Sequence, residues 1–300
     1  MHYDYVPMPQ RKPLRWPNGA RIAVILTINL EYWDLTVDTP NTFYAGGPQL
    51  LPDPLPGNVA DWPNYSWREY GQRVGIWRMM DLFDKFGLRA SCTTNAKTCL
   101  ERRPIIDAAK ERGWELVAHN YVQTELLTNY SFDRDKEKEI IGRTLDVYSK
   151  VVGKPAKGWL SSSMRCTTNT PEILTEYGLI FQADWLNDDQ PFVVHTAKGP
   201  LVQIPYTNEC NDFATFFRRG MTTRESFDVF KTQFDVLYHE GAKTGMLMNV
   251  GLHPHVIGQP FRIPALTDFL SYIKTFDDVW VATREEIAEW YLQHHKEHIA

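Results

Sequence analysis

Hydrophobic and polar positions along this 300-residue chain follow two patterns in turn: short apolar runs and longer stretches with helical spacing. The first apolar run, residues 21–30 (RIAVILTINL), is almost continuous, which is typical of a parallel strand covered on both faces. Residues 66–86 instead repeat apolar side chains every three or four positions, which predicts an amphipathic helix that ends at Gly87. The chain is therefore expected to begin with a buried strand followed by a helix.

The same alternation continues to the C-terminus. Further strands are expected at residues 88–94, 114–119, 156–160, 179–185, 201–206, 246–252 and 279–282. Further helices are expected at residues 104–112, 133–152, 171–177, 224–240 and 264–274, and a last one is expected to open at Thr283, which has capping-box spacing to Glu286. Repeated strand–helix units without a Gly/Ser-rich linker predict an α/β fold in which residues 1–300 form one domain, a closed or nearly closed (β/α) barrel of about seven strands. The Pro-rich residues 38–64 show no periodicity and are expected to form a long loop.

Composition narrows the class of protein. The chain is 43% hydrophobic and 23% charged, which is typical of a globular protein, and its net charge of -5 argues against a nucleic-acid or anionic-membrane partner. No apolar run approaches the roughly 18 residues of a membrane span. Four cysteines without a CxxC pair, and a start without a secretion-like apolar stretch, lead us to expect reduced thiols and a cytoplasmic location.

Polar residues collect where the expected strands end, and barrel enzymes place their chemistry at the C-terminal ends of strands. A single polar residue there could simply complete the hydrogen bonding of the sheet. The joint occurrence of one carboxylate and two histidines at three different strand ends is harder to explain in that way. We therefore expect one shared acid–base site formed by Glu31, His119 and His253.

Three of these strand ends, INLE, HNYVQ and GLHPH, resemble the polysaccharide deacetylase superfamily, whose members are deformed (β/α) barrels. Its deacetylases carry a basic and a metal-binding aspartate at the first place, two ligand histidines at the second and an acid histidine at the third. Here Asn29 and Glu31 stand in place of the aspartates, and Gln123 stands in place of the second ligand histidine, whereas His119 is unchanged. Because a carboxamide is a poor zinc ligand, the resemblance implies a weakened metal site, and we expect no catalytic metal or other cofactor, with zinc as the alternative.

Further stretches resemble one branch of that superfamily, the metal-independent allantoinases and cyclic-imide hydrolases. They are WPNGARIAV, EYGQRVGIWR, KGW, NDDQPF, IPYTNECNDF and GLHPHVIGQPFR, and they keep a common order over most of the chain. This resemblance implies hydrolytic opening of a cyclic amide, imide or ureide. It also implies a homo-oligomer, expected to be a tetramer, because the resembling families are commonly oligomeric.

Ring opening needs an activated water, a hydrogen-bond donor for the carbonyl oxygen and a proton for the departing nitrogen. We expect Glu31 to act as the base or as a water-orienting carboxylate, a role that a pKa raised by desolvation would favour. We expect His253 to act as the acid, and His119 to orient the water or polarise the carbonyl. The expected substrate-binding residues are the amides Asn29 and Gln123 and the aromatic residues Trp33, Trp159 and Trp185.

Two other hypotheses remain open at this point. In the first, Glu31 and His119 still hold zinc, and the protein is a metal-dependent polysaccharide or N-acetyl deacetylase. In the second, the barrel binds a ligand without catalysis, although a binding protein has no need of a potential acid–base pair.

Overall fold

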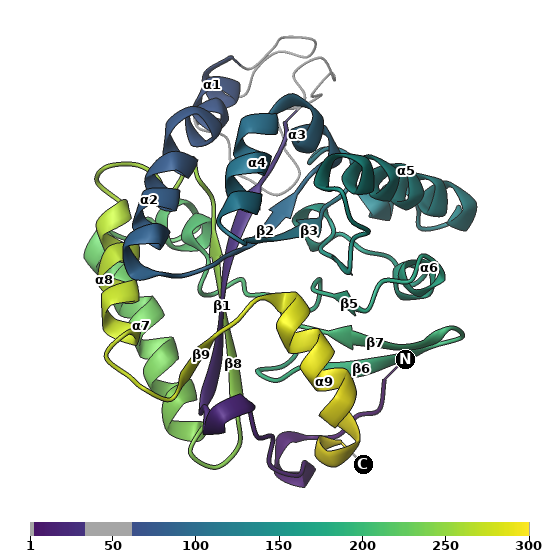
Figure 1. The fold of residues 1–300 in the computed structure, drawn as a ribbon, viewed down its shortest axis with the longest axis vertical. Helices are drawn as coiled ribbons and strands as arrows, with labels where there is room; N and C mark the ends of the chain where they lie inside the picture. Colours follow the sequence, from purple (N-terminus) through teal and green to yellow (C-terminus); the bar gives the residue numbers. More distant parts are fainter. Residues whose placement is uncertain (1–2, 34–61, 300) are drawn as a thin grey trace.

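A curled β-sheet forms the centre of the molecule in the computed structural model, which describes residues 3–33 and 62–299 (Figure 1). Within these residues the sheet has nine strands in the order β6-β7-β5-β4-β3-β2-β1-β8, and β9 pairs with β1. All neighbours are parallel except the β6–β7 hairpin. The strands are β1 (Ile22–Leu30), β2 (Ser91–Thr94), β3 (Glu115–Ala118), β4 (Gly158–Trp159), β5 (Phe181–Gln182), β6 (Phe192–Thr196), β7 (Gly199–Gln203), β8 (Met246–Leu252) and β9 (Val279–Val281).

Helices surround this sheet (Figure 1). They are α1 (Trp62–Tyr70), α2 (Ile76–Phe86), α3 (Ala96–Glu101), α4 (Arg103–Glu111), α5 (Arg134–Val152), α6 (Thr170–Glu176), α7 (Thr223–Glu240), α8 (Ile263–Ile273) and α9 (Arg284–His298). Their ends follow local rules: Gly87 closes α2 in the left-handed conformation at φ 63°, and Thr283 and Glu286 form a reciprocal capping box at the start of α9. No helix among the described residues is both long and apolar enough to span a membrane.

The barrel is closed by irregular backbone rather than by a regular strand. Between β7 and β8, the amide of Gly251 donates to the carbonyl of Cys210 at 2.9 Å, and Asn211 forms an isolated parallel bridge with Gly251. Further down β8, the amide of Leu247 donates to the carbonyl of Asp189 at 2.8 Å. These contacts place residues 210–212 against the C-terminal end of β8.

The expected deformed (β/α) barrel is confirmed. The strand expected at residues 246–252 is observed with the same bounds, and the other expected strands and helices are present with shifted ends. Two elements were not expected, the short helix α3 and the strand β6, which pairs antiparallel with β7. Residues 38–61 of the expected Pro-rich loop lie outside the described residues, whereas residues 62–64 begin α1 instead of ending a loop.

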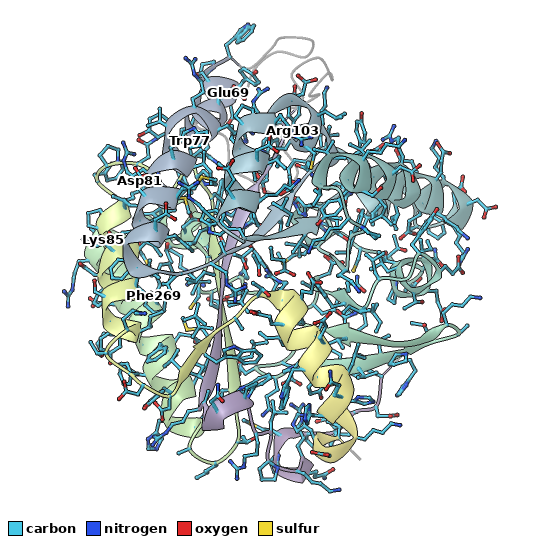
Figure 2. The ribbon with its side chains drawn as sticks, in the orientation of Figure 1. Glu69, Trp77, Asp81, Lys85, Arg103 and Phe269 are labelled. Atoms are coloured by element: carbon cyan, nitrogen blue, oxygen red, sulfur yellow. The ribbon has the colours of Figure 1, made fainter. Side chains whose placement is uncertain are left out.

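The expected helix at residues 66–86 is present, but its apolar face was only partly predicted. A π-helical turn at Gly71–Gly75 separates α1 from α2 and rotates the residues that follow it. As a result α2 buries Ile76, Met79, Met80 and Phe83, whereas Val74 and Trp77 are exposed. Trp77, Asp81 and Lys85 accordingly lie along the outer side of α2 (Figure 2).

Candidate active site

The C-terminal ends of the parallel strands meet around one small cavity of about 70 Å³. Glu31 follows β1, His119 follows β3 and His253 follows β8, so three distant segments contribute to the same wall. The residues of the segment after β7 complete the cavity. Its lining is Asn29, Glu31, His119, Gln123, Leu160, Ser161, Ser163, Met164, Tyr206, Asn208, Asn211, Phe213, Arg218 and His253.

A chain of charged groups crosses this cavity from Asp212 through His253 to Glu31. The Nδ1 atom of His253 lies 2.6 Å from Oδ1 of Asp212, and its Nε2 atom lies 3.7 Å from Oε1 of Glu31. Asp212 is itself held by the backbone amides of His253 at 2.6 Å and Ile257 at 3.2 Å. Because a carboxylate only accepts hydrogen bonds, Asp212 fixes a proton on Nδ1 of His253 and turns Nε2 towards Glu31.

Burial alone would favour neutral forms of both His253 and Glu31, but their mutual attraction reverses this. Desolvation opposes protonation of His253, yet the carboxylates of Asp212 and Glu31 outweigh it and raise the pKa of His253 to about 10. Desolvation likewise opposes ionisation of Glu31, yet the positive charges of His253 and Arg68 keep its pKa below its ordinary value of 4.5. At neutral pH the site therefore holds an imidazolium beside an ionised carboxylate.

The raised pKa that would favour Glu31 as a base is not found. Desolvation acts to raise the pKa of Glu31, but the neighbouring cation, which a sequence does not reveal, outweighs it. Two further groups fix the position of Glu31: the indole Nε1 of Trp33 donates to Oε2 at 3.0 Å, and the amide of Gln72 donates to the backbone carbonyl at 2.6 Å. Glu31 is therefore an ionised, oriented carboxylate rather than a protonated one.

His119 supplies a neutral imidazole to the cavity wall. Its Nδ1 atom lies against the backbone carbonyl of Leu160, which can only accept, so Nδ1 carries the proton and Nε2 carries a lone pair. Nε2 is buried and has no hydrogen-bond partner among the described residues. Burial lowers the pKa of His119, although the negative charge of Glu31 opposes the shift. His119 can therefore accept a hydrogen bond from a molecule in the cavity.

The two amides of the predicted site lie in the cavity wall, but their polar atoms are already engaged. Asn29 donates through Nδ2 to the hydroxyl of Tyr206 at 2.8 Å and accepts at Oδ1 from the hydroxyl of Thr93 at 2.8 Å. Gln123 accepts from the hydroxyl of Ser162 at 3.0 Å. Both amides thus orient other side chains, in addition to any contact with a substrate.

The three predicted aromatic residues do not line this cavity. Trp159 is fully buried in the hydrophobic core, where its indole donates to the hydroxyl of Ser161 at 2.9 Å. Trp33 supports Glu31 from behind, under the guanidinium of Arg68 at 3.9 Å. Trp185 belongs to a separate surface groove that also includes Tyr3, and it stacks on Phe192. Their predicted role in substrate binding is not supported by these positions.

Two residues of the site, Asp212 and Tyr206, were not predicted. Both lie in the irregular segment IPYTNECNDF (residues 204–213), which the sequence singled out only for its resemblance to the allantoinase branch. Asp212 does not follow a regular strand, so the strand-end rule could not find it. Its position beside His253 depends on closure of the barrel through Asn211 and Gly251.

The family resemblance raises the question of a zinc ion, and the described residues do not form a site that fits one. No group of three or more His, Cys, Asp or Glu side chains in the described ranges could hold a metal ion. One oxygen of Glu31 accepts from Trp33 and the other faces the imidazolium of His253, and Gln123 offers only an amide. A three-ligand zinc site of the usual kind is therefore not formed by these side chains.

Known proteins resemble the chain over nearly its whole length, although no family model matches it. It is 29% identical over 308 residues to a protein of Schizosaccharomyces pombe named "Putative polysaccharide deacetylase", with 93% of each chain covered. A crystal structure of a "probable polysaccharide deacetylase" from Pseudomonas aeruginosa PAO1 is 28% identical, with a TM-score of 0.81 and coverage of 93% of this chain and 94% of that one.

A crystal structure of PuuE allantoinase is equally similar in sequence. It is 28% identical, has a TM-score of 0.79 and is covered over 93% of each chain. These similarities, together with the fold and the arrangement of strand-end residues, support the polysaccharide deacetylase-like hydrolases as the superfamily of this chain.

Proposed function

We propose that this protein is a hydrolase that opens the C–N bond of a small cyclic amide, imide or ureide without a catalytic metal. The observation that carries the proposal is the charged chain Asp212–His253–Glu31, which presents a protonated acid and an ionised base to one cavity. The similarity to a structure named allantoinase supports the substrate class, and Gln123 in place of the expected second ligand histidine supports the absence of metal. A cavity of about 70 Å³ favours a small ring over a polymer chain.

The residues can carry the reaction as follows. Glu31 accepts a proton from water while the water oxygen bonds to the carbonyl carbon, and the free Nε2 of His119 is placed to accept the other water hydrogen. His253 then donates its Nε2 proton to the ring nitrogen as the C–N bond breaks. Transfer of the proton from Glu31 to His253 restores the starting ionisation of both groups. The products are a carboxylic acid, which loses its proton to solvent, and the released amide or urea end.

The test is a hydrolysis screen of the purified protein on cyclic imides, hydantoin-like ureides and allantoin. Ring opening is followed by mass spectrometry, with and without prior dialysis against a chelator. Glu31→Gln serves as the matched inactive control, because the amide keeps the size of the side chain and loses its charge. Hydrolysis of at least one ring compound by the dialysed wild type, and not by Glu31→Gln, is the expected result.

The same screen tests the metal-dependent alternative, to which the names of the S. pombe and P. aeruginosa relatives point. N-acetylated sugars are included, each with and without added zinc. Deacetylation that needs zinc, with no ring opening, would overturn the proposal. Tight binding of ring compounds without any turnover would favour a ligand-binding barrel instead.

A further inference from the structure

The hydroxyl of Tyr206 lies in the cavity wall between two carboxamides. Nδ2 of Asn29 lies 2.8 Å from it and Nδ2 of Asn211 lies 3.4 Å from it. Tyr206 is buried, with 9% of its surface exposed, and it lines the cavity together with both amides. Which of these groups donates decides what the hydroxyl can offer to a substrate.

The backbone fixes the orientation of both amides. Nδ2 of Asn29 also lies 3.3 Å from the backbone carbonyl oxygen of Leu252. Because a carbonyl oxygen only accepts hydrogen bonds, the atom that faces it must be the donating nitrogen of the amide. Oδ1 of Asn211 accepts from the backbone amide of Phe213 at 3.0 Å, so its other end must be the donating nitrogen. Both amides therefore donate to the oxygen of Tyr206 and occupy its lone pairs.

The hydrogen of the Tyr206 hydroxyl consequently needs another acceptor, and none is found among the described residues. The open direction is the cavity. We propose that Tyr206 donates this hydrogen to the carbonyl oxygen of the substrate amide and stabilises the negative charge that develops there as water adds. The inference rests on the proposed hydrolysis, and it assigns the carbonyl-binding donor that Glu31, His119 and His253 leave unassigned.

The surroundings keep Tyr206 protonated and in place. Burial raises its pKa above the ordinary value of 10, although the hydrogen bond from Asn29 and the positive charge of Arg284 oppose the shift, so the phenol remains a donor over the working pH range. A side chain at Gly251 would have its Cβ 2.7 Å from the hydroxyl and 2.6 Å from Nδ2 of Asn211. Gly251 thus leaves the space that this arrangement needs.

Asn29 and Asn211 are positioning residues in this scheme, because they act through Tyr206. An aspartate at position 29 would accept hydrogen bonds and not donate them. The Tyr206 hydroxyl would then turn its hydrogen towards that carboxylate and away from the cavity. The scheme therefore predicts that Asn29→Asp and Tyr206→Phe damage the same catalytic contribution.

The experiment measures kcat and KM for the best ring substrate with the wild type, Tyr206→Phe, Asn29→Asp and the double variant. Loss of one such donor is worth roughly 100-fold or more in kcat, and KM is expected to change by less than about threefold. The double variant should be about as slow as the slower single variant, because both changes remove one hydrogen bond. Tyr148→Phe is the control, because it also removes a buried hydroxyl. The hydroxyl of Tyr148 donates to the backbone carbonyl of Leu116, and Tyr148 does not line the cavity.

The outcomes separate the two proposals. If the wild type opens rings and either Tyr206→Phe or Asn29→Asp keeps kcat within threefold, the role of Tyr206 is wrong and the proposed function stands. If Tyr206→Phe and Asn29→Asp are both slow but the control Tyr148→Phe is equally slow, the effect is structural and the inference fails. The inference also fails if the reductions in kcat of the two single variants multiply in the double variant. If the wild type opens no ring, the proposed function and the role of Tyr206 fall together. Thermal melting of each variant shows which are folded, and Asn29→Asp decides the matter if Tyr206→Phe does not fold.

Discussion

Asp212→Asn tests whether the site works as a charged chain. The pKa of His253 rises from 6.5 to about 10 because two carboxylates face its ring, which corresponds to roughly 5 kcal/mol of stabilisation of the imidazolium. Asp212 lies at 2.6 Å and Glu31 at 3.7 Å, so the larger share comes from Asp212. Its replacement by the isosteric amide removes the nearer carboxylate and is expected to lower the pKa of His253 well below 10.

The assay is an NMR titration of the histidine ring nitrogens from pH 5 to pH 11, with the His253 signal identified by its loss in His253→Gln. The pH profile of kcat/KM is the second reading, and its alkaline limb should move down with the pKa of His253, because the acid must be protonated to donate. The signal of His294, a half-buried histidine of α9 outside the site, is the internal reference in both proteins. A His253 pKa that stays near 10 in Asp212→Asn would refute the argument that Asp212 sets the charge of the acid.

Three further predictions concern the same site and the assembly. Glu31→Gln should lower kcat by at least ~100-fold if Glu31 is the base, and a variant within threefold of the wild type would remove it from that role. Exhaustive dialysis against chelator should leave the ring-opening rate unchanged, whereas a loss restored by zinc would contradict the metal-free mechanism. Light scattering at micromolar concentration should give the mass of a tetramer, and a monomeric mass would end that expectation.

The elements that the sequence predicted well are those in which local pattern and burial agree. Every residue of β8 is buried, and its apolar run marks the strand from Met246 to Leu252. The capping box at Thr283 and the left-handed Gly87 are local signals in the same way. The strand-end rule then brought Glu31, His119 and His253 together, because parallel strands end at one edge of the sheet.

What was missed depends on contacts between distant segments. The strand β6 has only five residues, of which Phe192 and Val194 are buried, and it is recognised only through its pairing with β7. The aromatic residues Trp159 and Trp185 lie at the ends of expected strands, yet the side on which each packs is set by the curl of the sheet. Asp212 could not be assigned to His253 without the bridge between Asn211 and Gly251, a pairing that no periodicity encodes.

The charges of the site offer a physical reason for the amide at position 29. Asn29 is buried, with 4% of its surface exposed, and the cavity already holds the carboxylates of Glu31 and Asp212 against the single imidazolium of His253. The positive charge of Arg68 also acts on Glu31 and helps to balance the pair. A third ionised carboxylate here would be desolvated and repelled by its neighbours, which costs free energy of folding. An amide avoids that cost and keeps a donor aimed at Tyr206, so its neutrality is part of how the site is arranged rather than the remnant of a lost base.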